Sequence, residues 1–328
     1  MKDLVAHFND QLLDALDRLK GIKFSNTNTP FDIIFISGLG GSGIGGSMLQ
    51  DYFNANKISV PVFVGKDYDI PAWVNARTLF VACSYSGNTE ETISSIKQAE
   101  KKKAIITCIT SGGAVEAYAK KKNCNVILLP TGFPPRAAFA YSFSALLETM
   151  KQYKVIKADY QADVLAAVGT ITGEAKSIQK QAKVVAKKMA GKTVMMYCCN
   201  GFESVLVRFR QQINENGKML ACHHVIPEMN HNELVGWRQK GDYCTIFFRN
   251  KTDNARSQAR IDINKEVIKK YSKSIIEIHS QGESFLERAL YMVHFGDWVS
   301  VYLSEIYKLD PTEVKVIDHL KAALAKIK

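Results

Sequence analysis

The chain has 328 residues, of which 46% are hydrophobic and 23% charged, and this composition excludes a disordered tail protein, a collagen-like fibre and a small disulfide scaffold. At roughly 150 residues per domain, its length predicts two domains. Lys and Arg number 43 against 32 Asp and Glu, so the formal net charge is +11, and nucleic acid, an acidic membrane surface and a small anionic substrate are all candidate partners.

The N-terminal segment and the cysteines indicate the cellular compartment in which the protein is expected. Residues 1–20 place Leu at helical spacing among Asp and Lys, without the apolar run of a signal peptide, and no run elsewhere approaches the roughly 20 apolar residues of a membrane-spanning helix. The 7 cysteines form no CxxC pair and lie mostly in apolar, strand-like runs. We therefore expect reduced, buried thiols in a cytoplasmic protein that has no membrane span and no zinc site.

Short apolar runs alternate with helix-like segments after an N-terminal helix at 1–21. The first five predicted strands are 32–37, 61–65, 78–84, 104–110 and 125–130. These runs are apolar on both faces, which is typical of strands in a parallel sheet covered by helices, and a long helical pattern at 90–103 lies between two of them. The alternation predicts a doubly wound α/β domain.

A Lys-rich helical stretch at 158–191 separates this set from a second one. The second predicted strands are 193–199, 222–227, 243–249 and 274–279, and the helices between them are 202–216 and 254–270. Two helices at 285–307 and 313–327 end the pattern, with Asp310 and Pro311 expected to cap and begin the last one. We expect two similar α/β domains, 22–152 and 153–309, followed by a C-terminal helix at 310–328.

A glycine-rich turn, SGLGGSGIGG at 37–46, follows the first strand and opens a helix. Glycines let the backbone turn tightly and expose its N–H groups, and the start of a helix favours an anion. Gly38, Gly40 and Gly43 have dinucleotide-loop spacing, but no acidic residue ends the second strand in VFVGKD, and no Lys-Ser/Thr pair closes a P-loop. The turn favours a phosphate over a nucleotide, and an ordinary strand-to-helix turn is the alternative.

A hydroxyl-rich turn, CSYSGNTEET at 83–92, follows the third strand and precedes another helix. Its Ser84, Ser86 and Thr89 are suited to donate hydrogen bonds to a phosphate dianion, whereas helix capping alone would explain only one of the three. Because both turns follow strands of one parallel sheet, they are expected at the same carboxyl edge, where ligands bind.

GGSGIGG followed by SYSGNTEET resembles the phosphosugar-binding signature of the sugar isomerase (SIS) domain. Three further segments, LPTGFPPRAAFAYSF, NENGKMLACHHVIPEMNHNELVGW and DPTEVKVIDHLKAAL, resemble the bifunctional phosphoglucose/phosphomannose isomerase family, which has two SIS domains in one chain of about this length. The resemblance extends over nearly the whole chain. It implies two SIS-type domains and an aldose–ketose isomerase of glycolysis and gluconeogenesis that needs neither metal nor cofactor.

The implied reaction interconverts glucose 6-phosphate, and mannose 6-phosphate, with fructose 6-phosphate through ring opening and a cis-enediol. The residues implied for binding the phosphate are Gly40, Gly41, Ser42, Ser84, Ser86 and Thr89. Glu215, in INENGK, matches the family's proton-transfer base, although its position alone would suggest an exposed residue at a helix end. Arg136, in GFPPRAAF, is suited to stabilise the enediolate because it stays protonated and its guanidinium has a fixed direction.

Ring opening requires a further acid and base. By resemblance this role belongs to His231, in MNHNELVGW, contributed by the neighbouring subunit of a homodimer, together with Lys321 of the terminal helix. A loop histidine hydrogen-bonded to a neighbour and a solvated helical lysine are the structural alternatives. His223 and His224 compete on sequence alone, but they lie in a strand-like run and are expected to have supporting roles.

Three other functions compete with this one. A non-catalytic SIS regulator that senses a sugar phosphate would share the two turns without needing Glu215, His231 and Arg136 together. An isomerase of another phosphosugar would use the same fold. A nucleic-acid-binding protein would need basic clusters, but those at 101–103 and 120–122 lie at helix ends without interleaved aromatics and are better explained as solvated helix faces.

Overall fold

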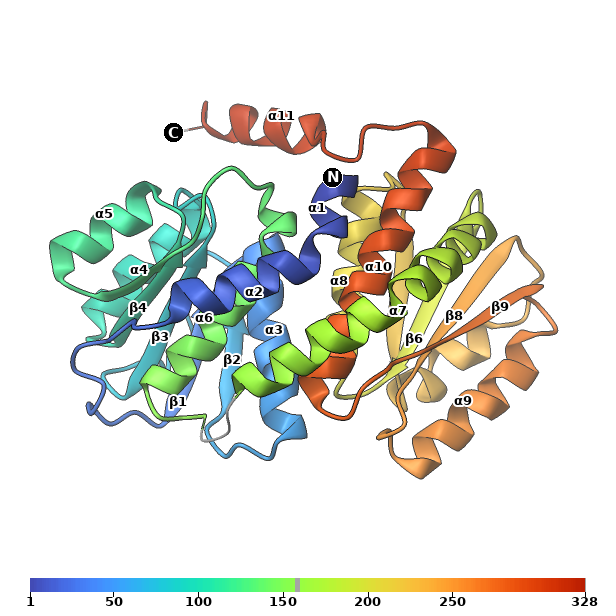
Figure 1. The fold of residues 1–328 in the computed structure, drawn as a ribbon, viewed down its shortest axis with the longest axis horizontal. Helices are drawn as coiled ribbons and strands as arrows, with labels where there is room; N and C mark the ends of the chain where they lie inside the picture. Colours follow the sequence, from blue (N-terminus) through green and yellow to red (C-terminus); the bar gives the residue numbers. More distant parts are fainter. Residues whose placement is uncertain (157–159, 328) are drawn as a thin grey trace.

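The computed structural model describes residues 1–156 and 160–327, and Figure 1 shows two α/β units lying side by side with a layer of helices between their sheets. The first two residues of the helix predicted at 158–191 lie outside these ranges. In the described ranges, no helix has both the length and the apolar character required to cross a bilayer.

The first sheet has five parallel strands in the order β2-β1-β3-β4-β5. The strands are β1 (Ile33–Ser37), β2 (Val62–Gly65), β3 (Thr78–Ser84), β4 (Ile105–Thr110) and β5 (Asn125–Leu128). The helices that follow them are α3 (Gly40–Ala55), α4 (Glu90–Lys101), α5 (Gly113–Lys122) and α6 (Phe139–Gln152). The doubly wound parallel sheet predicted from the apolar runs is confirmed.

Successive side chains along a strand point to opposite faces of this sheet, and each face packs into a different hydrophobic core. Ile34 and Ile36 of β1 pack into the core that includes α3 and α6, whereas Phe35 packs on the opposite face with α4 and α5. Both faces are therefore apolar, because helices cover both of them.

The second sheet has four parallel strands in the order β7-β6-β8-β9. The strands are β6 (Thr193–Cys199), β7 (Ala221–Ile226), β8 (Tyr243–Arg249) and β9 (Ser274–His279). The helices of this unit are α7 (Tyr160–Met189), α8 (Glu203–Glu215), α9 (Ala255–Ile268) and α10 (Phe285–Tyr307). Among the described residues, the connections also contain the short 3-10 helix η1 (Pro135–Ala137) in the first unit, and η2 (Glu228–His231) and η3 (Glu233–Gly236) in the second.

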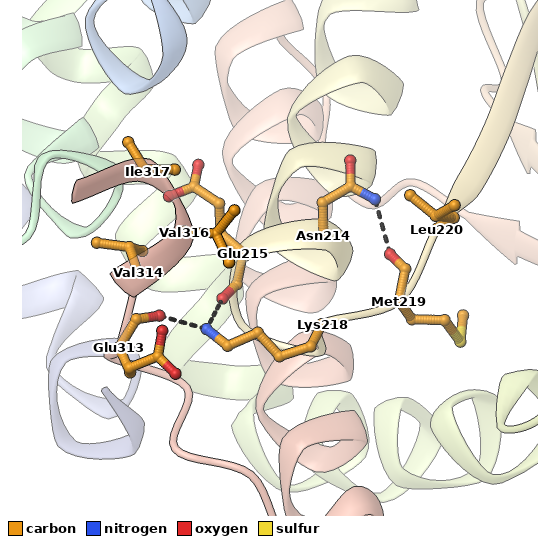
Figure 2. A pocket seen from close by; sticks show the side chains of 9 residues that line it. All are labelled: Asn214, Glu215, Lys218, Met219, Leu220, Glu313, Val314, Val316 and Ile317. Atoms are coloured by element: carbon orange, nitrogen blue, oxygen red, sulfur yellow. Dashed lines mark hydrogen bonds between the residues drawn. The ribbon is translucent and has the colours of Figure 1, made fainter. Parts of the chain in front are cut away.

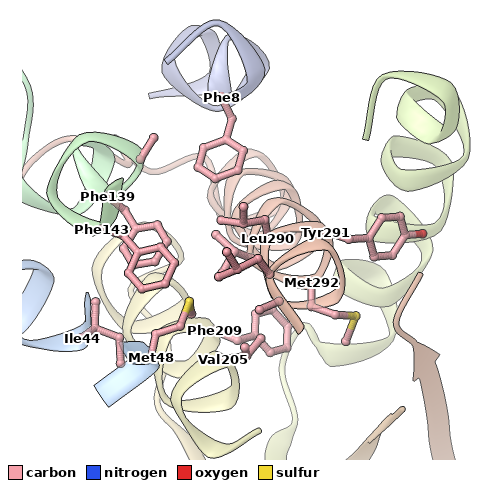
Figure 3. Close-up of a cluster of buried hydrophobic side chains, with 14 of the residues drawn as sticks. Phe8, Ile44, Met48, Phe139, Phe143, Val205, Phe209, Leu290, Tyr291 and Met292 are labelled. Atoms are coloured by element: carbon pink, nitrogen blue, oxygen red, sulfur yellow. The ribbon is translucent and has the colours of Figure 1, made fainter. Parts of the chain in front are cut away.

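The two units share one hydrophobic core. Met48 from α3 and Phe143 from α6 belong to the same buried cluster as Phe209 from α8 and Leu290 from α10, and Figure 3 shows these helices converging there. Each of the four side chains is at most 2% exposed. Because the core is continuous across the boundary between the units, it holds their sheet edges in a fixed relationship.

Helices also lie at both ends of the chain. The predicted N-terminal helix forms as α1 (Lys2–Ala6) and α2 (Phe8–Leu19), whose apolar face belongs to the shared core. At the other end, α11 (Lys315–Leu324) buries none of its residues and extends along the outside of the molecule in Figure 1.

The predicted start of the last helix is wrong. Asp310 does not cap it: its Oδ1 accepts a hydrogen bond from the backbone N–H of Thr312 at 2.8 Å, and the helix begins only at Lys315, with Val314 as its N-cap residue. The physical reason is a side-chain turn of the kind that aspartate readily forms. Pro311 consequently lies outside the helix, and its carbonyl is available to another partner.

Candidate active site

The two predicted phosphate turns lie against each other at the carboxyl edge of the first sheet. Strands β1 and β3 are neighbours, and the backbone N–H of Tyr85 donates to Ser42 Oγ at 3.0 Å, which joins the second turn to the first. The packing is close enough that a Cβ at Gly38 would lie 2.9 Å from the carbonyl oxygen of Cys83. Only glycine fits at this position, so the close packing of the two turns explains why residue 38 is a glycine.

Helices α3 and α4 both begin at this edge, and no side chain of their N-cap residues occupies the backbone N–H groups of the first turn. Neither Leu39 nor Thr89, the two N-cap residues, makes a side-chain cap hydrogen bond. Thr89 Oγ1 instead lies 2.9 Å from Ser84 Oγ, which also accepts from the Gly87 N–H at 3.1 Å. Backbone donors and hydroxyls at paired helix N-termini are the chemistry that binds a phosphate.

Arg136 lies directly beside the glycine turn. A Cβ on Gly41 would lie 3.0 Å from the carbonyl oxygen of Pro135 and 3.1 Å from the backbone nitrogen of Arg136, so the turn and η1 are in contact through that glycine. A phosphate on the turn would therefore be next to the segment that carries the arginine.

The guanidinium of Arg136 connects three segments that are distant in the sequence. Nε donates to Asn216 Oδ1 at 2.8 Å, Nη1 lies 3.3 Å from Glu215 Oε2, and Nη2 donates to the carbonyl oxygens of Pro311 at 2.6 Å and Thr312 at 3.1 Å. The residue is only 4% exposed. Burial lowers the pKa of Arg136, and the negative charges of Glu215 and Asp310 oppose this shift. The guanidinium nevertheless stays protonated, because the ordinary pKa of arginine is far above neutral pH.

Glu215 is the last residue of α8 and shares a cavity of about 300 Å³ with the start of α11. Figure 2 shows its side chain reaching towards Ile317, while Lys218 Nζ donates to the backbone carbonyls of Glu215, at 2.6 Å, and Glu313. Burial, and next the charge of Arg136, lower the pKa of Lys218. The full lining consists of Asn214, Glu215, Lys218, Met219, Leu220, Glu313, Val314, Val316 and Ile317.

A buried polar network fixes the backbone behind this pair. Asn216 is fully buried, and its Nδ2 donates to Ser300 Oγ at 2.9 Å, which in turn donates to the carbonyl of Asp297 at 2.7 Å. Arg208 Nη2 lies 3.0 Å from Asp297 Oδ2 and donates to the carbonyl of Arg136 at 3.3 Å. Burial raises the pKa of Asp297, and the charge of Arg208 opposes that rise.

Sequence reasoning missed Arg208 and Asp297. For Asp297 the available signal was a single charge in the otherwise apolar helical run HFGDWVS, because an unpaired charge at such a position would be strongly destabilising. Arg208 gave no such signal, since Arg210 and two glutamines follow it in VRFRQQ. The two residues lie on α8 and α10, and their pairing joins the helices that support Glu215 and Asn216.

His231 and Lys321 come from two further segments of the chain. His231 ends η2 beyond strand β7, Lys321 lies on α11, and both are exposed. In the described part of the chain, no hydrogen bond or ion pair connects either of them to Arg136 or Glu215.

The two competing histidines are engaged elsewhere. Nδ1 of His224 lies 2.9 Å from Glu233 Oε2, and Nδ1 of His223 lies 3.0 Å from Arg210 Nη1. Both histidines are thereby tied to side chains of their own unit. Across residues 1–156 and 160–327, no group of three or more His, Cys, Asp or Glu side chains is arranged to hold a metal ion.

All 7 cysteines are free thiols, and the expectation that they are buried holds for most of them. Cys222 is an exception, because it lies exposed on β7, an edge strand of the second sheet.

Comparison with known proteins agrees with this arrangement. Residues 32–156 match the SIS domain, and residues 178–324 match the bacterial phospho-glucose isomerase C-terminal SIS domain. The chain is 36% identical to the bifunctional phosphoglucose/phosphomannose isomerase of Caldicellulosiruptor bescii over the whole of both chains. This chain belongs to the bifunctional phosphoglucose/phosphomannose isomerase family. A second family member, from Aquifex aeolicus, is 35% identical over 91% of this chain and 92% of its own.

Other matches lie outside the phosphoglucose/phosphomannose isomerases. D-glucosamine-6-phosphate 4-epimerase from Sulfolobus acidocaldarius is 30% identical over 84% of this chain and 86% of its own. Among solved structures, tagatose-6-phosphate ketose/aldose isomerase from Escherichia coli superimposes with a TM-score of 0.75 at 14% identity, covering 94% of this chain and 93% of its own. This last likeness concerns the fold alone, and it agrees with the two SIS matches.

Proposed function

We propose that this protein interconverts glucose 6-phosphate and mannose 6-phosphate with fructose 6-phosphate. The observation that carries the proposal is the position of Arg136, which contacts the phosphate turn through Gly41 and lies 3.3 Å from the carboxylate of Glu215. A phosphate anchor, a fixed cation and a carboxylate base are the groups that a metal-independent aldose–ketose isomerisation requires.

The proposed reaction begins with the phosphate on the two turns of the first unit. It contacts Gly40, Gly41, Ser42, Ser84, Ser86 and Thr89. His231 and Lys321 open the pyranose ring by moving a proton from the C1 hydroxyl to the ring oxygen, which breaks the C1–O5 bond. An imidazole suits this step because it can accept and donate a proton near neutral pH.

Isomerisation follows on the open chain. Glu215 removes the C2 proton of the aldose, and the electron pair forms the enediolate while the C1 carbonyl oxygen gains negative charge beside Arg136. Glu215 then returns its proton to C1, and a proton passes from the C2 hydroxyl to the C1 oxygen, leaving the carbonyl at C2. Rotation within the bound open chain brings either C2 epimer to the same base.

A homodimer completes the proposed site, with His231 supplied by the neighbouring subunit. The apolar side chains of α11 support this arrangement: Val316, Leu320 and Leu324 recur at every fourth residue and are 82%, 57% and 42% exposed. Such a stripe on a helix is typical of a face that packs against another surface. The free cysteines support a cytoplasmic location.

A kinetic assay tests the proposal. We expect glucose 6-phosphate and mannose 6-phosphate each to yield fructose 6-phosphate, at rates that a chelator does not change. Binding of these sugars without turnover would instead identify a regulator. Conversion of glucosamine 6-phosphate to its C4 epimer, with no ketose formed, would assign the site to the reaction named for the Sulfolobus relative.

A further inference from the structure

A second cavity, of about 490 Å³, lies at the carboxyl edge of the second sheet. The loops that follow β6 and β8 form one side of it, and the C-terminal end of α3 forms another, at Asn54 and Ala55. The other lining residues are Asn200, Gly201, Phe202, Asn250, Thr252, Asp253, Asn254, Phe285 and Arg288.

This cavity occupies the place in the second unit that the phosphate turns occupy in the first. The order β7-β6-β8-β9 corresponds to β2-β1-β3-β4, so β6 and β8 are the counterparts of β1 and β3. In open parallel sheets, ligands bind outside the carboxyl ends of such central strands. The topology therefore gives this chain two equivalent edges, of which the proposed isomerase reaction uses one.

The second edge is unsuited to a phosphate. The backbone N–H of Ser204, at the start of α8, already donates to Asp51 Oδ2 at 3.0 Å, and the N–H of Arg256, at the start of α9, donates to Asn254 Oδ1 at 2.9 Å. At the first edge the corresponding helices have no side-chain caps. An anion at the second edge would lose these donors and meet the carboxylate of Asp51.

The lining nevertheless contains one buried polar atom that lacks a partner among the described residues. Asn250 is 5% exposed, and its Oδ1 has no hydrogen-bond partner in the described ranges. Arg288 is 6% exposed and donates from Nη1 to the carbonyl of Glu283. Asp253, which accepts from the Asn250 N–H at 3.1 Å, places a carboxylate in the same lining as this cation. Leaving a buried amide oxygen unsatisfied costs about 1–3 kcal/mol, and a rotation of the Asn250 side chain that brought this oxygen to the cavity would let a ligand hydroxyl recover that cost.

The remaining lining is aromatic and amide. The rings of Phe202 and Phe285 lie with centroids 6.0 Å apart in an edge-to-face arrangement. A guanidinium donates to hydroxyls, a carboxylate accepts from them, and an amide does both, while an aromatic ring packs against C–H groups. Since the cation and the carboxylate in the lining offset each other, the lining favours an uncharged ligand.

We propose that this cavity binds a small, neutral, polyhydroxylated molecule of the hexose class. It is a site separate from the isomerase site, because the 16 residues of α3 extend roughly 24 Å from the phosphate turn to the cavity wall. The proposal does not depend on the isomerase activity, since its ligand carries no phosphate and its residues take no part in the proposed reaction.

Titration of the full chain with D-glucose, followed by ligand-observed NMR, tests the proposal. Ala55→Tyr, at the end of α3, and Thr252→Tyr, in the loop after β8, fill the cavity from two different segments at exposed positions. Each is expected to weaken D-glucose binding at least about tenfold, or about 1.4 kcal/mol. Ala117→Tyr, at an exposed position of α5 that lines a different, apolar groove, is the matched control and should bind D-glucose as the unmodified protein does.

Inorganic phosphate, titrated in parallel, separates the two edges. Its binding should be unchanged by Ala55→Tyr and lowered by Ser42→Ala in the glycine turn. The proposal is overturned if D-glucose does not bind, if both tyrosine variants bind it as tightly as Ala117→Tyr does, or if Ala55→Tyr displaces phosphate instead of D-glucose.

Discussion

The guanidinium of Arg136 lies 3.3 Å from the carboxylate of Glu215, although 79 positions separate the two residues in the chain. Arg136 comes from the first SIS unit and Glu215 from the second, so the pair exists only because the units share one core. The proposed reaction depends on this contact, since it brings the proposed base beside the proposed cation, next to the turn that is proposed to bind the phosphate.

Glu215→Gln is expected to abolish isomerisation while leaving phosphosugar binding largely intact. The amide keeps the size of the side chain but cannot accept the C2 proton, and loss of a general base typically costs about 10²–10⁴-fold in rate. Turnover of fructose 6-phosphate and binding of glucose 6-phosphate, measured separately, check this outcome.

Glu313→Gln is the matched control, because Glu313 lines the same cavity but contributes its backbone carbonyl, not its side chain, to the hydrogen bond with Lys218. Its turnover should remain close to that of the unmodified protein. Near-normal turnover in Glu215→Gln would show that another group is the base.

Gly41→Ala is expected to weaken substrate binding. The added Cβ would lie 3.0 Å from the carbonyl oxygen of Pro135, so either the phosphate turn or the η1 segment carrying Arg136 must move. Moving the turn raises KM, and moving the arginine lowers kcat. Steady-state kinetics distinguishes the two effects.

Gly173→Ala provides the comparison, since a Cβ at that position of α7 meets nothing within 4 Å. Alanine there should raise stability by about 0.5–1 kcal/mol through the ordinary helix preference and leave the kinetics unchanged. If Gly41→Ala behaved in the same way, the close contact would have no role in binding.

The stability of the protein is expected to fall with acid because of His294. This residue is 4% exposed, stacks on Phe8, and accepts a hydrogen bond at Nε2 from Trp298 at 3.1 Å. Burial lowers its pKa from 6.5 to about 4. Between these values the unfolded chain binds a proton that the folded chain does not, so stability is fully present above pH 6.5 and lost as the pH falls towards 4.

The shift in the pKa of His294 corresponds to about 3 kcal/mol of unfolding free energy, at 1.36 kcal/mol per pKa unit. His294→Gln removes the titrating group and retains an acceptor for Trp298, so its urea unfolding should lose less stability between pH 7 and pH 4. His319→Gln, at an exposed position of α11, should keep the acid sensitivity of the unmodified protein. Identical pH profiles for His294→Gln and His319→Gln would contradict this account.

The strands could be predicted from the sequence because each is a continuous apolar run between polar or glycine-rich segments. The predicted and observed bounds of β3, β6, β8 and β9 coincide. The parallel topology followed from the alternation with helices, and the contact between the two turns followed from their placement after strands of one sheet.

Contacts between distant segments could not be predicted in the same way. The position of Arg136 depends on Asn216 and on the carbonyls of Pro311 and Thr312, and no local pattern encodes a bond between segments so far apart. The start of α11 was mispredicted for a related reason: the Asp310 turn and the bonds to Arg136 hold this segment outside the helix.

Leu320→Lys is expected to dissociate the proposed homodimer and reduce turnover with it. Leu320 is 57% exposed on a helix that buries none of its own residues, and a charge placed in an apolar interface must be desolvated without a partner. If His231 of the neighbouring subunit opens the ring, the separated subunits should lose activity and recover it at high protein concentration.

Ile263→Lys, 61% exposed on α9, introduces the same charge on another surface and should leave the sedimentation behaviour and turnover unchanged. A fully active monomer would exclude a site shared between subunits and would require His231 to be replaced as the ring-opening group.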